Sequence, residues 1–206
     1  MGNGGARNTF RVNVENLGYA DVEENTENGY RIGEKKRIPG SMTIDLQFEV
    51  ASGKLYGDGK IVANMSQITG ATLKIGLNKL GLGDRCAILG HRYEGGIADF
   101  AAGDSAPEKA WYYEIPSDDG EHVEKVWLLC GTAQPAAITA KQREENITYS
   151  TDELTVSFSA IKMKQGNKNT VIRMMDTSEG GATPEMEKAF ESNPYPENLE
   201  GAVVAV

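Results

Sequence analysis

The sequence has little of the chemistry that catalytic and metal sites use. Among its 206 residues are two histidines, His91 and His122, and two cysteines, Cys86 and Cys130. Neither histidine has a serine or cysteine in a recognisable nucleophile motif such as G-x-S-x-G, and no Cys or His pair has the spacing of zinc ligands. We therefore expect no enzyme activity, no metal and no cofactor. Both histidines are expected in structural roles, and both cysteines as buried thiols of a reducing compartment.

Positive charge and long apolar runs are also scarce. Lys and Arg number 21 against 30 Asp and Glu, which gives a net charge of −9. Because proteins bind phosphate backbones through Lys and Arg that displace counterions, this balance disfavours sequence-specific DNA or RNA binding. The C-terminal GAVVAV is too short to span a bilayer, and the N-terminal MGNGGARNTF has no apolar leader. We expect a soluble protein made in a cytoplasm, with no membrane partner.

Glycine, in contrast, is abundant at 24 residues, which is typical of a turn-rich β protein. Apolar and polar residues alternate over long stretches, and this alternation predicts strands with one buried face. The clearest case is residues 42–50, where Met, Ile, Leu, Phe and Val alternate with Thr, Asp, Gln and Glu. Further strands are expected over residues 61–65, 73–77, 111–115, 123–130 and 154–160, with short ones at 10–14, 19–23 and 171–174.

Two segments carry helix signals. The first is predicted over residues 79–89, where Gly90 follows as a possible C-cap. The second is predicted over residues 185–191, with Thr183 as N-cap and Pro184 at the first helical position. The order of strands, one helix, more strands and a short terminal helix predicts a mainly β protein, with a sandwich or barrel-like domain and one flanking α-helix.

The stretch GKLYGDGKIV, residues 53–62, resembles a phosphate-binding loop at first sight. A P-loop requires Ser or Thr after Gly-Lys, but Ile61 stands there, and a dinucleotide turn requires a third glycine where Val62 stands. The flanks alternate as strands, and Gly-Asp-Gly supplies the positive φ angles of a tight reversal. The stretch is therefore predicted to be a hairpin tip.

The arms of this hairpin, about residues 42–55 and 60–69, are longer than the usual strand of about five or six residues. A two-stranded ribbon is marginally stable alone in water, and exposed strand edges pair with other chains. The hairpin therefore predicts assembly, with contact candidates at its tip. These candidates are Leu55, Tyr56, Gly57, Asp58, Gly59 and Lys60. The favoured two are Tyr56 and Asp58, and the alternative is that both only shape the turn.

In order and spacing, several segments resemble the major tail tube proteins of bacteriophages with long, non-contractile tails, the siphophage major tail protein family. The resemblance covers roughly residues 16–163. Its segments are NLGYA (16–20), IPGS (38–41) before the strand 42–50, YGDG (56–59), TGATLKI (69–75), ILG (88–90) and residues 100–115. Gly57 and Gly59 depart from the family's usual Ala and Asn, and residues 1–11 and those after 180 are not covered.

The resemblance implies a tail tube β domain over residues 16–180, with a long hairpin at 42–69. An N-terminal arm, 1–15, and a C-terminal short helix and tail, 181–206, flank it. It further implies a structural virion protein whose copies form hexameric rings, and whose rings stack into a tail tube. Genomic DNA passes through the lumen of that tube during ejection without specific binding. The implied partners are other copies of the chain, a tape measure protein, and tail terminator and tail tip proteins.

An acidic tube wall would let DNA slide, whereas a basic wall would hold it by counterion release. Asp45 and Glu49, on the polar side of the strand 42–50, are the candidates for residues that face the lumen.

Two other interpretations remain open. One is a tube subunit of a phage-tail-like bacteriocin or secretion system, which would build similar rings. The other, of a different class, is a carbohydrate-binding β-sandwich module with Trp111, Tyr112 and Tyr113 as a stacking platform. The alternative for these aromatics is a single core face, with Tyr112 pointing outward.

Overall fold

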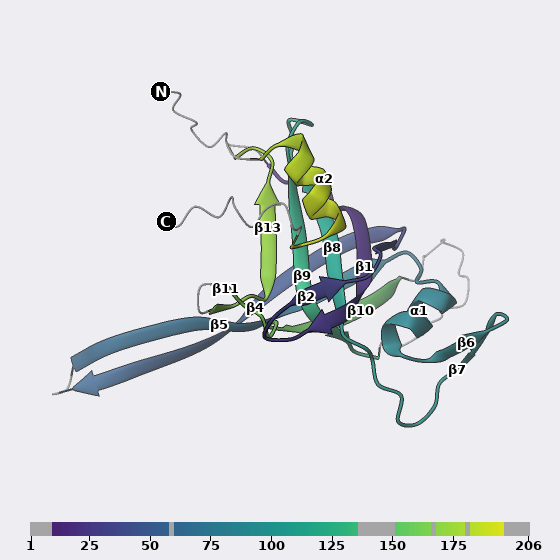
Figure 1. The fold of residues 1–206 in the computed structure, drawn as a ribbon, viewed down its shortest axis with the longest axis horizontal. Coiled ribbons are helices and arrows are strands. Elements are labelled where there is room, and N and C mark those ends of the chain that lie inside the picture. Colours follow the sequence, from purple (N-terminus) through teal and green to yellow (C-terminus); the bar gives the residue numbers. More distant parts are fainter. Residues whose placement is uncertain (1–9, 58–59, 136–150, 166–167, 180–181, 196–206) are drawn as a thin grey trace, which may run out of the picture.

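The computed structural model describes residues 10–57, 60–135, 151–165, 168–179 and 182–195 (Figure 1). These residues form antiparallel strands and two helices, so the prediction of a mainly β protein is confirmed. In chain order the elements are β1 Glu15–Asn25, β2 Tyr30–Ile32, β3 Lys36–Arg37, β4 Ser41–Gly57, β5 Lys60–Leu77, α1 Leu82–Leu89, β6 Arg92–Glu94, β7 Ile97–Asp99, β8 Lys109–Pro116, β9 Val123–Ala133, β10 Asp152–Ser159, β11 Lys164–Gln165, β12 Lys168–Asn169, β13 Ile172–Asp176 and α2 Pro184–Ser192.

One antiparallel sheet of nine strands carries the fold. Its main order is β2-β1-β8-β9-β10-β5-β4. Strand β9 branches, because residues 124–128 pair with β13 while residues 130–133 pair with β10. Side chains from β1, β8 and β9 meet side chains from β5 and β10 in a single buried cluster. The sheet therefore folds over on itself, and the first core lies between its two halves.

Strands β8 and β9 are buried on both faces. Trp111 and Tyr113 point into the first core, between the two halves of the sheet. Tyr112 and Trp127 point into a second cluster of buried residues beneath α2. The expectation that Tyr112 points outward is therefore wrong. Tyr112 packs beside Trp127, with ring centroids 4.9 Å apart, and the Lys35 ammonium lies 4.0 Å from its ring centroid. Since α2 and Lys35 cover this face, the strand has no exposed side.

Both predicted helices are present. Helix α1 begins at Leu82, three residues later than expected over 79–89, and ends at Leu89 as predicted. Gly90 follows as its C-cap with a φ of 77°. A Cβ atom at Gly90 would lie 2.2 Å from the Ser105 carbonyl oxygen, so only glycine fits there. Helix α2 begins at Pro184 as predicted, and Thr183 Oγ1 accepts a hydrogen bond from the Met186 N–H at 3.3 Å.

The N-terminal strands were predicted only in part. Residues 19–23 lie within β1, as expected, but no strand forms over residues 10–14, where Arg11 makes one isolated bridge to Ser117. The short strands β2, β3, β6, β7, β11 and β12 were not predicted.

Both cysteines are free and buried as expected, and burial raises the pKa of Cys130 to about 11.

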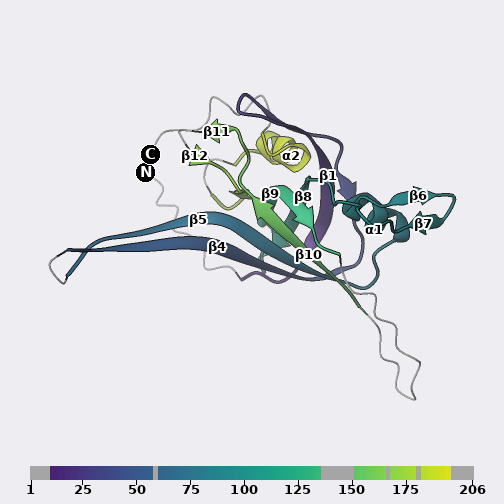
Figure 2. The same cartoon turned by 90° about the horizontal axis from the view of Figure 1, so that it is seen from below.

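The longest elements are β4 and β5, of 17 and 18 residues. They pair from Ser41 opposite Leu77 to Gly57 opposite Lys60, so the predicted hairpin exists and is longer than the expected 42–69. Near the body, Ile44 and Leu46 pack against the first core. Farther out, the ribbon projects away from the body in both views (Figures 1 and 2).

Candidate assembly surfaces

The projecting part of the hairpin, residues 49–57 and 60–70, is called the arm. At about 3.3 Å per residue, residues 49–57 extend by roughly 30 Å. The side chains described at residues 49–54 and 65–69 are all exposed. A ribbon of this length makes no core of its own, so its apolar residues are left for another surface to cover.

An apolar stripe runs from the core onto the arm. Phe48 lies at the base of the arm, and Val50 follows on the same side of β4 because side chains alternate. Val50 pairs with Ile68 beyond a β-bulge, so these two side chains stand next to each other. Their exposed fractions are 50% for Phe48, 53% for Val50 and 57% for Ile68. Contiguous apolar surface of this kind marks an interaction site.

A hollow of about 350 Å³ lies beside the base of the arm. Ile44, Leu46 and Phe48 line one side of it, and Tyr113 lines it from β8. Burial raises the pKa of the Tyr113 phenol to about 12, and the Arg11 side chain also lines the hollow. The base of the arm thus continues into a mainly apolar depression with one charged residue in its wall.

The outer edge of β4 has no strand partner among the described residues, because β4 is the last strand in the sheet order. Natural edge strands are usually short, bulged or covered, since their free N–H and C=O groups pair with other chains. A free edge on a strand of 17 residues is therefore a second feature that suits assembly.

Asp45 and Glu49, the candidates for the lumen, are exposed on the polar side of β4. Gln47 Nε2 donates to Asp45 at 2.9 Å, and Thr72 Oγ1 donates to Glu49 at 3.0 Å. The two carboxylates thus belong to a polar row that crosses β4 and β5. Their role in a lumen stays a prediction.

The predicted contact residues lie at the far end of the arm. The backbone register places Tyr56 opposite Ile61 and Gly57 opposite Lys60. The side chains of Leu55, Tyr56 and Lys60 lie outside what the structure describes, as do Asp58 and Gly59 altogether. Their part in a contact also stays a prediction.

A second apolar surface lies on α1, β6 and β7, at the opposite end of the molecule from the arm in both views (Figures 1 and 2). Residues 80–104, which include these three elements, are called the lobe. Its exposed large apolar residues are Leu82, Tyr93, Ile97 and Phe100, with exposed fractions of 41%, 49%, 70% and 54%. The sequence prediction missed this surface, although Gly95-Gly96 between two short runs is a signal for a two-residue hairpin.

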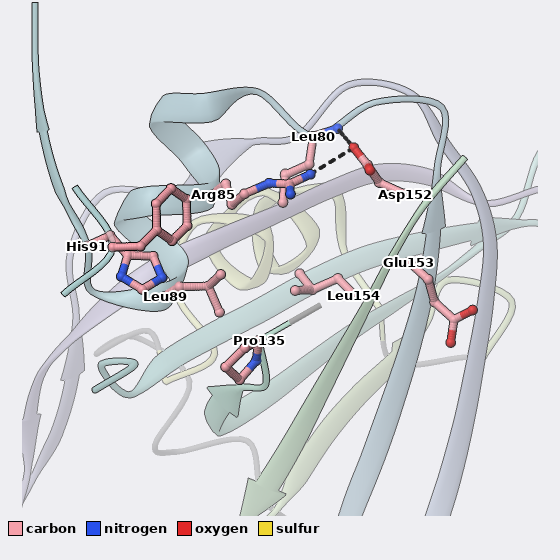
Figure 3. Close-up of a pocket in the computed structure, with 9 residues that line it drawn as sticks. Leu80, Arg85, Leu89, His91, Pro135, Asp152, Glu153 and Leu154 are labelled. Carbon is pink, nitrogen blue, oxygen red and sulfur yellow. Dashed lines mark hydrogen bonds and ion pairs between the residues drawn. The ribbon is translucent and has the colours of Figure 1, made fainter. Parts of the chain in front are cut away.

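A pocket of about 150 Å³ opens where the lobe meets β10 (Figure 3). Its apolar walls are Leu80, Leu89, Phe100 and Leu154. Asp152 at its edge is already paired, because it lies 3.1 Å from an Arg85 guanidinium nitrogen and accepts from the Leu80 N–H at 2.8 Å.

His91 completes the pocket wall. Its ring packs against Phe100 with centroids 4.3 Å apart and the ring planes tilted by 50°, and its Nδ1 lies 2.7 Å from Asp104 Oδ2. The hydrogen bond from His91 lowers the pKa of the Asp104 carboxyl. The other histidine, His122, has its Nδ1 2.5 Å from Asp119 Oδ2 in the turn before β9. Both histidines thus hold loops in place through a neighbouring aspartate.

Trp111, Tyr112 and Tyr113 are 0%, 0% and 2% exposed, so they form no stacking platform and the carbohydrate-binding interpretation of these residues is wrong. Within the described ranges, no group of three or more His, Cys, Asp or Glu side chains is placed to hold a metal ion. Neither α1 nor α2, the helices that these ranges contain, is long and apolar enough to cross a membrane.

The chain matches no protein-family model. It also matches no curated protein sequence. Among solved structures, one similar chain is the cap that terminates the tube of the anti-feeding prophage, determined by cryo-EM. It is 8% identical with a TM-score of 0.40, and the match covers 78% of this chain and 87% of that chain.

Proposed function

We propose that this protein is a self-assembling structural subunit of a phage tail tube, whose copies form hexameric rings that stack along the tail. The observation that carries the proposal is the arm, with its apolar stripe and the free edge of β4. A chain that functioned alone would expose this surface to water with no compensating contact.

The shape of the subunit supports growth by addition of further copies. The arm projects from one end of the molecule (Figure 1). In this proposal it meets a different surface on its neighbour, so the contact is heterologous. Heterologous contacts close into a ring when the rotation between copies closes, and otherwise continue along an axis. Stacked rings use both possibilities, one within a ring and the other along the tube.

The charge of the chain supports a conduit for DNA. At a net charge of −9, the subunit lacks the excess of Lys and Arg with which proteins hold phosphate backbones. In this proposal Asp45 and Glu49 face the lumen and repel the passing genome. The mature protein would then reside in the virion, after synthesis in the host cytoplasm, and its other partners would be tape measure, terminator and tip proteins.

Purified protein at increasing concentration tests the proposal by light scattering and negative-stain electron microscopy. We expect rings or tubes about 100 Å wide, because six domains of this size would surround a bore wide enough for DNA. Removal of residues 54–60 is expected to abolish tube growth, while circular dichroism shows the domain still folded. A chain that stays monomeric under all conditions would contradict the proposal.

A further inference from the structure

We infer that the arm of one copy docks on the lobe of a second copy, and that Ile68 fills the pocket lined by Leu80, Leu89 and Phe100. This inference rests on the proposed function and names the surface that receives the arm. Both surfaces are apolar, exposed and uncovered by any described part of the same chain.

The positions of the two surfaces require two copies. The arm points away from the lobe in both views, so a chain does not cover its own pocket with its own arm (Figures 1 and 2). A copy that donates its arm to one neighbour keeps its lobe free for another. This arrangement gives head-to-tail growth rather than a closed pair.

The pocket has the size and chemistry for one large apolar side chain. A cavity of about 150 Å³ lined by apolar side chains accepts a molecule the size of benzene. Ile68 is the exposed apolar residue on the arm that stands beside Val50, so one side chain can enter the pocket while the other covers its rim. A buried anchor surrounded by contacts that exclude water from it is the usual form of an energetic hot spot.

The charged groups at the pocket would not oppose this contact. Arg85 and Asp152 are paired with each other, as Figure 3 shows, and the Glu153 carboxylate points away from the pocket. Docking would therefore leave no buried charge without a partner, which is the feature that makes burial of charges costly.

The sequence charges of the two surfaces do not oppose the contact. Residues 49–70, the arm with its tip, contain Lys54 and Lys60 against Glu49 and Asp58, so this segment is neutral in a strongly acidic chain. The lobe has four acidic residues against two arginines and is therefore negative. A neutral arm meets an acidic lobe without the like-charge repulsion that another acidic surface of this chain would cause.

The test uses two variants that each disable one surface. Ile68→Asp disables the arm, Phe100→Asp disables the lobe, and both positions are more than half exposed, so we expect both variants to fold. Each variant alone should fail to form rings or tubes. An equimolar mixture should form a dimer of twice the 22.3 kDa chain in light scattering, because one intact arm meets one intact lobe and growth then stops.

The matched control is Gln67→Asp, which adds the same charge to the neighbouring arm position on the opposite side of the ribbon. It should assemble like the unchanged protein. If the unchanged protein assembles but Ile68→Asp or Phe100→Asp alone also does, or if their mixture remains monomeric, the inference is wrong and the proposed function stands. If the unchanged protein never assembles, both are wrong.

A cysteine pair identifies the contact directly. Ile68→Cys and Phe100→Cys are prepared separately, mixed and oxidised, and non-reducing gels should show a disulfide dimer only in the mixture. The native Cys86 and Cys130 are 1% and 3% exposed and provide a low background. Replacing Ile68→Cys by Gln67→Cys should lower the yield at least tenfold. A dimer formed by Ile68→Cys alone would show an arm-to-arm contact instead and would overturn the inference.

Discussion

The indole N–H of Trp127 donates to the backbone carbonyl of Phe190 at 2.6 Å, and this bond joins the middle of β9 to the last turn of α2. The Phe190 ring lies in the second cluster with Tyr112 and Trp127. Glu191 follows it and pairs with Lys35 at 3.2 Å and with Lys125 at 3.5 Å. The C-terminal helix is thus part of the folded domain and closes its second core.

Phe190→Ala should therefore destabilise the domain by about 3 kcal/mol, since removing a buried Phe ring leaves a cavity. Urea unfolding followed by tryptophan fluorescence measures this change. Lys188→Ala, at an exposed position of the same helix, is the control and should change stability by less than about 0.5 kcal/mol. Equal effects of the two substitutions would show that α2 does not close the core.

Gly90→Ala should lower the free energy of unfolding by about 2 kcal/mol. The residue has a positive φ, and an added Cβ would collide with the Ser105 carbonyl oxygen. Gly53→Ala is the control, because a Cβ there meets no atom within 4 Å. Thermal unfolding of both variants distinguishes them, and a stable Gly90→Ala protein would contradict the close approach.

Stability should fall at acid pH through carboxyls bound to histidines. The hydrogen bond from His122, supported by the Glu121 N–H, lowers the pKa of Asp119 from its ordinary value of 3.8 to about 2. A carboxyl with a lowered folded-state pKa stabilises the fold above its unfolded pKa and loses that contribution as pH falls through the folded value. Urea midpoints should therefore decrease between about pH 4 and pH 2. Asp119→Asn should be less stable at neutral pH and show a smaller decrease, and an unchanged decrease would contradict the assignment.

A double substitution, Asp45→Lys with Glu49→Lys, tests whether these side chains face the lumen. Tubes of the variant should retain DNA at low salt and release it at high salt, because lysines on the wall would bind phosphates by displacing counterions. Absorbance at 260 and 280 nm of washed tubes measures the retention. Glu121→Lys with Glu185→Lys adds the same charge at other exposed positions and is the control. Equal retention of DNA by both variants would show that Asp45 and Glu49 do not face the lumen.

The alternation of apolar and polar residues was sufficient to predict the hairpin, but it did not predict that β8 is buried on both faces. In β4 the polar side chains Asp45 and Glu49 are exposed, as predicted. The apolar side is only partly buried, because Ile44 and Leu46 pack against the core while Met42, Phe48 and Val50 are at least half exposed. In β8 the aromatic Tyr112 occupies the position where a one-sided strand would have a polar residue, and it is buried because α2 lies over it. That helix is distant in the sequence, so local periodicity does not indicate what it covers.

The sequence likewise predicted one of the two candidate assembly surfaces and not the other. Spacing excluded phosphate binding at residues 53–62, and strand length predicted a projecting arm. Helix α1 of the lobe was predicted, but β6 and β7 were missed because they have three residues each, too few for a periodic pattern. The pocket brings together Leu80, Phe100 and Leu154, and their proximity depends on how α1 packs beside β10. No local sequence pattern contains that information.

The free edge of β4 affects how the subunit behaves in solution. Backbone N–H and C=O groups accept any extended segment, whatever its side chains, so the edge does not distinguish a correct neighbour from a misfolded one. Selectivity must then come from Asp45, Glu49 and Lys54, which lie along β4 and repel segments of the wrong charge. Salt that screens these charges should shift the same solution from ordered polymer to amorphous precipitate.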